Sequence, residues 1–365
     1  MHRRSFLALS GAFALSPAFA DDFGDYVSDN LALSHTPGMS VAAVKGGRVA
    51  FAAGYGYADV ARARRVTPDT VFQIASVSKT VTATALMLLA QDGVFHLDDP
   101  IAPHLDFPVA SPKFPDVPIT FRHLFTHTSG ISDAVYDGLD FSGAPIAPLR
   151  DFLSGYLAAP KGYTGAKPGT AWRYSNVGVA LLGHLAGRVS PAPLDAITRD
   201  RLFAPLGMRS TSWRYAGVDE ARLAHGYDFA QARYLPLPRN AYPDWPAGLL
   251  CTSANDFARF LALYTRGGAG ILTHETIAAM FTPDPAVMNP NSPKLRQGLI
   301  WELAPFGDVT IALHPGGDPG SATLAAIDPS SGTAALSFAN VTPDKAILSL
   351  QKDVVHRLLD RARTA

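Results

Sequence analysis

A serine and a lysine three residues apart, Ser76 and Lys79, precede an almost uncharged stretch rich in Ala and Leu that Gly93 closes. Such a stretch is typical of a buried helix, here beginning near Ser76. Three residues is close to one helical turn, so both side chains share a face of its first turn. That turn also carries unpaired backbone N–H groups and the positive end of the helix dipole. A hydroxyl nucleophile, an amine base and N–H donors for an oxyanion are what acyl transfer requires.

Ser-x-x-Lys alone is equally compatible with a capping serine and an ordinary surface lysine. Two further segments could converge with it. Tyr174-Ser175-Asn176 lies in a loop before an apolar helix, and His314-Pro315-Gly316-Gly317 lies at the end of a predicted strand. Taken singly, each has a structural interpretation: a core tyrosine, an asparagine helix cap and an ordinary strand end.

The elements around these motifs predict strands at both chain ends and helices between them. Residues 39–44 and 48–53 flank Gly46-Gly47, which favours a hairpin. Four further strands are predicted near the C-terminus, at residues 297–303, 309–313, 322–327 and 333–338. A last helix over 344–361 carries one apolar stripe, formed by Ile347, Leu348, Leu350, Val354, Val355, Leu358 and Leu359. The fold class is therefore α+β, with one antiparallel sheet formed from both chain ends, flanked by helices, and an inserted α-helical lobe.

The middle of the chain is predicted to be mainly helical. Helices are expected over residues 148–157 and 177–189, and Thr120, Ser253 and Thr273 are expected to cap three others. Residues 282–293, rich in proline, are expected to form a long surface loop. We expect one catalytic domain from residue 21 to 365, with a mixed lobe at about 21–75 and 297–365 and a helical lobe at about 76–296.

The first twenty residues have the pattern of an export signal. Arg3-Arg4 precede a short apolar region, and Ala18-Phe19-Ala20 is an Ala-x-Ala cleavage signature. The apolar region is too short to span a bilayer, and Arg3-Arg4-Ser5-Phe6-Leu7 is similar to a twin-arginine signal. The sequence therefore predicts an exported, periplasmic protein, by the twin-arginine or the general secretory route. Its single cysteine, Cys251, allows no internal disulfide and lies in an apolar run, so we expect it to be buried.

Composition excludes several classes of function. The 365 residues are 47% hydrophobic and carry 31 basic and 31 acidic side chains. This balance gives no support for a nucleic-acid partner, and no segment after the signal reads as transmembrane. The histidines form no His-Glu-x-x-His or similar cluster, so we expect neither a metal nor another cofactor. Oligomeric state is not readable from the sequence.

Together, in this order and spacing, the three motifs resemble those of the penicillin-recognising, serine β-lactamase-related hydrolases. That family takes in class C β-lactamases, DD-peptidases, related esterases and D-amino-acid amidases. The Tyr-x-Asn form of the second motif is similar to the class C and DD-peptidase branch. The resemblance extends to residues 124–130, 205–208 and 247–252, so it covers nearly all of residues 25–360 and implies a β-lactamase/transpeptidase-like fold.

The resemblance implies a role for each motif residue. Ser76 would be the acylated nucleophile, and Lys79 would take or relay its proton. Tyr174 would be the general acid/base, and Asn176 would hold Lys79 and the substrate amide. The backbone N–H groups of Ser76 and Gly317 would form the oxyanion hole. Gly316 and Gly317 together would be the oxyanion and substrate-binding residues of the third motif.

A useful lysine base needs its pKa lowered from ~10.4 to about 7–8, which costs roughly 3–5 kcal/mol. A helix N-terminus contributes only ~0.3–1 kcal/mol at an exposed site. Burial must therefore supply most of the change in pKa. We expect Lys79 to be buried between the lobes.

The third motif departs from the β-lactamase pattern, because His314 and Pro315 stand where the family has lysine and a hydroxyl residue. His314 would be mostly neutral at pH 7 and would act mainly as a hydrogen-bond donor to Tyr174. Pro315 has no hydroxyl and no N–H. In the family, the lysine and the hydroxyl help to bind a substrate carboxylate. We therefore expect a serine hydrolase that acts on a small ester, amide or peptide.

The alternatives are a class C-like β-lactamase or D-alanyl-D-alanine carboxypeptidase, and a slowly deacylating protein that binds cell-wall fragments or β-lactams. A metallohydrolase is a further, poorly supported class, which treatment with a chelator would test. Deacylation measured after a rapid first acylation would separate an enzyme from a binding protein.

The departure at the third motif gives a first prediction. His314→Lys combined with Pro315→Thr should raise kcat/KM for carboxylate-bearing β-lactams relative to neutral esters, because it restores a cation and a hydroxyl. Hydrolysis of benzylpenicillin and of a neutral phenyl ester by both proteins measures this ratio. An unchanged ratio would refute the carboxylate argument.

Overall fold

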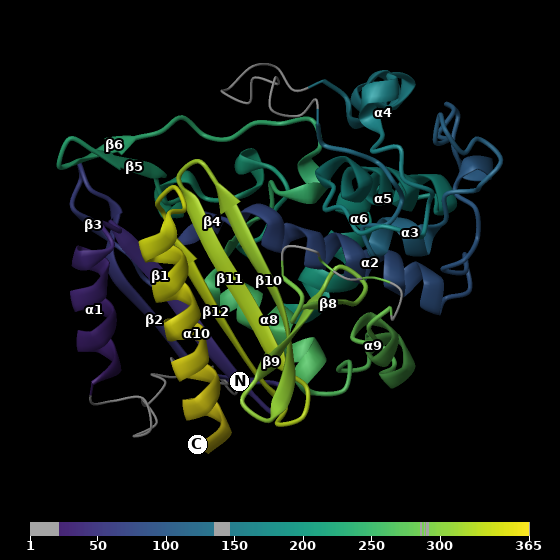
Figure 1. The fold of residues 1–365 in the computed structure, drawn as a ribbon. Helices are drawn as coiled ribbons and strands as arrows, with labels where there is room; N and C mark the ends of the chain where they lie inside the picture. The colour runs from purple at the N-terminus through teal and green to yellow at the C-terminus, as the bar shows by residue number, and fades with distance from the viewer. Residues whose placement is uncertain (1–21, 135–146, 285–286, 288, 290–291, 365) are drawn as a thin grey trace, which may run out of the picture.

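The structure, a computed structural model, describes residues 22–134, 147–284, 287, 289 and 292–364. The predicted export signal and part of the predicted 282–293 loop lie outside these residues. Eight strands form one antiparallel sheet in the order β3-β2-β1-β12-β11-β10-β9-β8 (Figure 1). Strands from the two chain ends meet at β1 and β12, where Met39 pairs with Ala339 and Lys45 with Thr333. The α+β prediction of one sheet built from both termini is confirmed.

The strands of the large sheet come from the two ends of the chain. On one side lie β1 (Gly38–Lys45), β2 (Arg48–Asp59) and β3 (Arg64–Arg65). On the other lie β8 (Arg296–Gln297), β9 (Glu302–Phe306), β10 (Val309–Asp318), β11 (Ser321–Asp328) and β12 (Thr333–Ala339). The predicted hairpin is present, and its turn residues Gly46 and Gly47 both have positive φ, which glycine adopts at little cost.

Two strand predictions were wrong in extent. Residues 297–303 do not form one strand, because the chain turns between β8 and β9 at Ile300, whose φ is +69°. β10 does not end before His314 but continues to Asp318, paired with β11 throughout that stretch. Its pairing with β9 stops at Leu313. Among the described residues, Pro315 therefore has a neighbouring strand on one side of β10 only, the situation in which a sheet tolerates proline.

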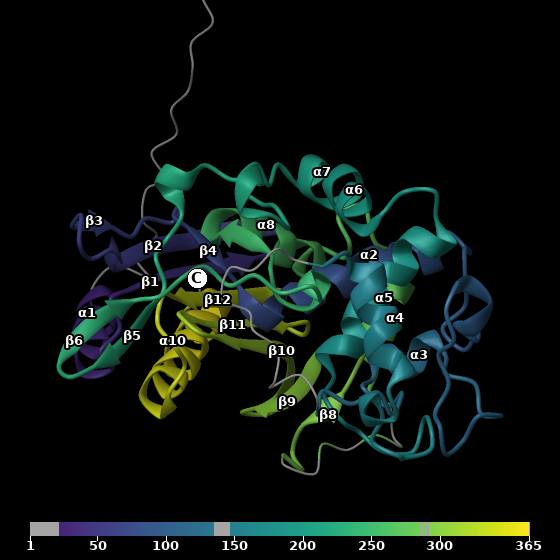
Figure 2. The same cartoon turned by 90° about the horizontal axis from the view of Figure 1, so that it is seen from above.

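Helices cover both faces of the sheet (Figure 2). α1 (Phe23–Leu33) and α10 (Lys345–Thr364) pack on one face in a core that includes Val41, Ile311 and Ala326. The predicted stripe of α10 is buried except at Leu348, which is 46% exposed. Leu348 follows Ile347 directly, so it points about 100° away from it around the helix. Gln351 and Ala362 complete the buried stripe.

The other face is covered by α8 (Ala254–Thr265), and the helical region extends beyond it. This region contains α2 (Ser78–Gln91), α3 (Phe121–Phe125), α4 (Leu149–Ala158), α5 (Asn176–Val189), α6 (Leu194–Thr198), α7 (Ala204–Leu206) and α9 (His274–Met280). Two small sheets are formed by β4 (Val71–Gln73) with β7 (Cys251–Ser253) and by β5 (Tyr227–Ala230) with β6 (Arg233–Pro236). The β5–β6 pair lies beside the large sheet, near β3 (Figure 1).

The predicted helix caps are confirmed. Thr120, Ser253 and Thr273 each accept a hydrogen bond from the backbone N–H three residues on, at the starts of α3, α8 and α9. α5 begins one residue earlier than predicted and is capped by Ser175, not by Asn176. No helix in the described part of the chain is long and apolar enough to span a membrane.

Candidate active site

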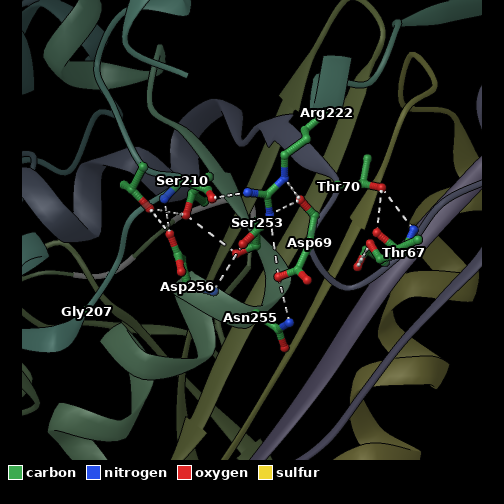
Figure 3. Close-up of polar contacts among 12 residues, drawn as sticks. Thr67, Asp69, Thr70, Gly207, Ser210, Arg222, Ser253, Asn255 and Asp256 are labelled. Carbon is green, nitrogen blue, oxygen red and sulfur yellow. Dashed lines mark hydrogen bonds and ion pairs between the residues drawn. The ribbon is translucent and has the colours of Figure 1, made fainter. Parts of the chain in front are cut away.

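The segment that leads to Ser76 is tied to the helical region by β4 and by a polar network. β4 pairs with β7, with Val71 opposite Ser253. Arg222 donates to the carbonyl oxygen of Asp69 and to Ser210 Oγ (Figure 3). The Asp69 carboxylate in turn accepts from Asn255 of α8. These contacts hold the chain on both sides of the turn before the predicted nucleophile.

Ser76 lies in a short 3-10 turn, Ala75–Val77, and α2 begins two residues later than predicted, at Ser78. Ala75 has a φ of +46°, a left-handed conformation that is uncommon for residues other than glycine. Ser76 is only partly buried, although its neighbours from Val71 to Leu89 are all buried. The turn therefore presents one hydroxyl at the surface of an otherwise buried segment.

Lys79 is fully buried, as expected. Its Nζ atom lies 2.8 Å from Ser76 Oγ and donates to the carbonyl oxygen of Ala247 at 2.7 Å. The carbonyl belongs to a 3-10 turn, Trp245–Ala247, that Thr82 of α2 also holds through the carbonyl of Pro246. Burial lowers the pKa of Lys79 from 10.5 to about 8, against the opposing effect of Asp244, Asp318 and Asp133.

Tyr174 reaches the same place from the loop before α5. Its hydroxyl hydrogen-bonds with Ser76, and Lys79 Nζ lies 5.0 Å from the centre of its ring. Burial raises the pKa of Tyr174 far above its ordinary value, and the hydrogen bond with Ser76 only partly opposes this. The phenol therefore stays protonated at neutral pH.

His127 supports the Tyr174 loop and was not singled out as a site residue in the sequence. Its ring centre lies 4.6 Å from that of Tyr174. Its Nδ1 atom accepts from the Ser175 N–H and its carbonyl oxygen from the Arg173 N–H. Burial, and then the charges of Lys79 and His314, lower the pKa of His127 well below its usual value, so the ring is neutral.

Asn176 is the first residue of α5, but its predicted contact with Lys79 is absent. No hydrogen bond joins the two side chains among the described residues, and Lys79 is held by Ser76 and Ala247 instead. The Asn176 N–H donates to Asp133 Oδ2 at 2.6 Å, and Ser175 and Val177 donate to Asp133 Oδ1. Asp133 thus stabilises the N-terminus of α5, where a negative charge is favourable.

The β10 backbone packs directly against the Ser76 turn. A Cβ atom at Gly316 would lie 2.8 Å from the carbonyl oxygen of Ile74 and 3.1 Å from the Ser76 nitrogen. Thr323 of β11 also donates to the Ile74 carbonyl. Only glycine allows this approach, and it brings the neighbouring Gly317 beside the predicted nucleophile.

His314 does not donate to Tyr174 as expected. Its Nδ1–H donates to the carbonyl oxygen of Pro315 at 2.7 Å, and the two ring centres of His314 and Tyr174 are 6.4 Å apart. Because Nδ1 carries the proton, Nε2 is an acceptor, and it is buried without a partner among the described residues. Burial and the nearby Lys79 lower the pKa of His314 to about 3, so the ring is neutral, as predicted.

Carboxyl groups act on Lys79 and Tyr174 through their charge, and no motif in the sequence identifies them. Asp133, Asp244 and Asp318 act on Lys79, while Glu302, Asp133 and Asp318 act on Tyr174. They come from four separate segments of the chain. The only available signal was that Asp318 follows the third motif directly.

Two further predictions concern the thiol of Cys251 and the presence of a metal site. Cys251 is fully buried in β7, and burial raises the pKa of its thiol to about 12, which excludes it as a thiolate nucleophile. Among the described residues, no group of three or more His, Cys, Asp or Glu side chains is arranged to hold a metal ion.

The sequence is similar to a known protein family and to several known proteins. The family model described as Beta-lactamase matches residues 23–356. A similar curated protein is an unguisins hydrolase of Aspergillus campestris, 29% identical over 343 residues, which cover 88% of this chain and 61% of the relative. A staphylococcal protein named flp is 27% identical over 64% of this chain and 47% of its own length. The chain thus spans about half to three fifths of the length of these relatives.

Two solved structures share the fold. A D-amino acid amidase from Ochrobactrum anthropi SV3 is 25% identical, with a TM-score of 0.74 over 94% of this chain and 99% of the amidase. EstCE1, described as a hydrolase with promiscuous acyltransferase activity, is 22% identical, with a TM-score of 0.78 over 93% of this chain and 98% of that protein.

The buried amine gives a second prediction, on stability. Lowering the Lys79 pKa from 10.5 to about 8 corresponds to roughly 3 kcal/mol of destabilisation while the unfolded lysine is charged. Lys79→Met should therefore raise the free energy of unfolding at pH 7, by about 1–3 kcal/mol because the Ala247 carbonyl loses its donor. The gain should shrink between pH 8 and 10.5, where the wild-type unfolded state loses its extra proton.

Denaturant unfolding of both proteins from pH 7 to 10.5 measures this difference. Lys345→Met, at an exposed position of α10, is the matched control and should change stability little at any pH. A variant at Lys79 that is less stable than the wild type at pH 7 would contradict the prediction.

Proposed function

We propose that this chain, which belongs to the β-lactamase family, hydrolyses an ester or amide bond of a small molecule through an acyl-enzyme on Ser76. Serine hydrolase chemistry follows from the family. The observation that carries the finer assignment is the 2.8 Å contact between Ser76 Oγ and a buried amine whose pKa is about 8. At pH 7 about a tenth of such an amine is neutral and able to take a proton.

The proposed reaction uses this pair in both halves. Neutral Lys79 accepts the Ser76 hydroxyl proton while Oγ bonds to the substrate carbonyl carbon. The N–H groups of Ser76 and Gly317 stabilise the oxyanion. The leaving group departs with the proton of the Tyr174 hydroxyl, which Lys79 restores. A water molecule then attacks the carbonyl carbon of the acyl-enzyme. Its proton passes through Tyr174 and Lys79 to Ser76 Oγ, and the carboxylic acid product is released.

Lys79, rather than Tyr174, is the group assigned as base. A phenol whose pKa burial has raised so far cannot accept a proton as phenolate at neutral pH, but it can pass one on while remaining protonated. Asn176 is proposed to contact substrate only, because its amide makes no hydrogen bond with Lys79.

Electrostatics favour neutral esters and amides over carboxylate-bearing substrates. The third motif supplies a neutral imidazole and a proline, and several carboxyl groups lie near Ser76. A substrate carboxylate would therefore meet repulsion and find no cation at this motif. β-Lactamase and D-alanyl-D-alanine carboxypeptidase activity are therefore our second candidate functions. Export to the periplasm remains a proposal that rests on residues 1–20.

The nucleophile assignment gives a third prediction. Ser76→Ala should lower kcat/KM for p-nitrophenyl acetate by about a thousandfold or more, because no acyl-enzyme can form. Ser78→Ala is the matched control, since Ser78 Oγ is buried and only accepts from the Leu250 N–H. It should retain activity within about tenfold.

Intact-mass spectrometry during turnover should show an acetyl adduct on the wild type and on Ser78→Ala, but not on Ser76→Ala. Full activity in Ser76→Ala would contradict the mechanism. An adduct that forms rapidly and persists would instead favour a slowly deacylating binding protein.

The base assignment gives a fourth prediction, on pH. Because Lys79 must be neutral, kcat/KM should rise about tenfold per pH unit below pH 8 and level off above it. Asp318 raises the pKa of Lys79, so Asp318→Asn should move the midpoint to lower pH, with the amide oxygen still able to accept from Gln73 and Tyr242. A profile that is flat between pH 6 and 9 would exclude Lys79 as the base.

A further inference from the structure

A groove of about 990 Å³ lies between the first half of β2 and α8. One wall is formed by residues 48–53 of β2. The opposite wall comes from α8, and Leu206 of α7 and Ile271 add apolar surface. None of the residues that line the groove belongs to the three motifs. The groove is therefore a surface distinct from the proposed active site.

The β2 wall of this groove is an open sheet edge. β3 pairs with β2 only at Tyr57 and Asp59, near the end of the strand. Residues 48–53 pair with β1 on one side and, in the described part of the chain, have no strand on the other. An open edge of this kind presents unpaired backbone N–H and C=O groups.

The direction of these backbone groups follows from the strand register. The Gly56 carbonyl accepts from the Val66 N–H on the outer side of β2. Successive residues of an antiparallel strand turn their hydrogen-bonding groups alternately to the two sides, so Ala52 directs its N–H and C=O outward as well. No hydrogen bond from another described segment reaches Ala52. A ligand lying along this edge must offer donors and acceptors, which an extended peptide has and an acyl chain lacks.

The charge of the groove indicates what such a peptide carries. The charged residues among those that line it are Arg48, Arg259 and Arg266, with no acidic residue. Arg259 is paired with Asp256, whereas Arg48 and Arg266 form no ion pair with any described residue. Arg259 and Arg266 are seven residues apart, about two helical turns, so they share one side of α8.

Arg266 is held beside the start of β2. A Cβ atom at Gly47 would lie 2.6 Å from the Cβ of Arg266, so the stem of this arginine packs directly on the hairpin turn. The Gly47 N–H also donates to Thr265 Oγ1 at 3.1 Å. These contacts fix one end of the groove and keep two unpaired guanidinium groups near it.

We propose that this groove binds an acidic, extended segment of a partner protein as an additional strand on β2. Main-chain hydrogen bonds to the open edge hold the segment. Its acidic side chains on the α8 side meet Arg259 and Arg266, and Arg48 attracts them from the strand. A second copy of this chain fits less well, because two such edges would bring arginines together.

Three fluorescein-labelled peptides of equal length test the proposal: VEVEVEV, VKVKVKV and VEPEPEV. The third keeps the charge of the first but lacks two backbone N–H groups. Fluorescence anisotropy at low salt should give a Kd for VEVEVEV that is about tenfold or more below that of either other peptide. Equal binding of VKVKVKV would refute the charge argument, and equal binding of VEPEPEV would refute strand addition.

Variants then place the peptide in the groove. Arg48→Glu and Arg266→Glu should each raise the Kd for VEVEVEV by about fivefold or more, because both arginines are unpaired. Arg214→Glu, the same change at an exposed arginine that does not line the groove, should leave the Kd unchanged. Thermal unfolding of all three checks that they remain folded. An unchanged Kd in both groove variants would overturn the proposal.

Hydrogen exchange of the wild type keeps the test independent of variant folding. VEVEVEV should slow amide exchange in residues 48–53. Protection of residues 314–318 instead, at the open part of β10, would overturn the proposal. Displacement of the peptide by dodecanoate would identify an acyl-chain site, and self-association that the peptide disrupts would identify a second copy as the occupant. Either result would also overturn it.

Discussion

Burial of the Lys79 amine is the constraint on which the site depends. Removing an ammonium from water is unfavourable unless hydrogen bonds and opposite charges compensate. Here the Ala247 carbonyl and the Ser76 hydroxyl take its hydrogen bonds, and Asp244, Asp318 and Asp133 supply negative charge. The compensation is incomplete, and this is what brings the pKa into the range of a working base. The same burial that makes the group useful also makes it a cost to stability.

The sheet places the remaining groups around that amine through backbone contacts. β10 approaches the Ser76 turn closely because Gly316 has no side chain, and hydroxyl groups of β11 hold the chain that leads to Ser76. On the opposite side, His127 and Asp133 fix the backbone of the loop that carries Tyr174. Two parts of the fold thus set the distances between the proposed nucleophile Ser76, the proposed base Lys79 and the Tyr174 phenol.

The third motif has changed its chemical character relative to the β-lactamase pattern that the sequence resembles. Where that pattern has a lysine and a hydroxyl, this chain has a proline and a neutral imidazole whose buried Nε2 atom is an acceptor without a partner among the described residues. The carboxyl groups of Asp133, Asp244 and Asp318 make the electrostatic potential around Lys79 more negative. In a fold shared with proteins described as a hydrolase and an amidase, a few side chains beside the proposed nucleophile thus change the charge of the site.

The features of this protein that could be predicted from its amino-acid sequence are those that depend on local chemistry. Helix caps at Thr120, Ser253 and Thr273, the hairpin at Gly46-Gly47 and the burial of α2 all follow from spacing and residue type. The order of the three motifs also indicated the family. Predictions from local sequence were wrong where distant contacts set the length of an element. β10 continues past His314 because β11 pairs with it. α5 begins one residue earlier than predicted, since Ser175 caps it and Asp133 accepts from the N–H of Asn176.

The electrostatics of the site could not be predicted from the sequence and depend on the folded arrangement of the chain. The pKa values of Lys79 and His314 depend on burial and on charged groups that are far away in the chain: Asp244 and Asp318 act on Lys79, and Lys79 acts on His314. No residue type or spacing encodes these, because desolvation and charge–charge interactions act through space. Residue type and spacing pointed to Ser76 and Lys79 as the candidate pair, and the fold set the charge that surrounds them.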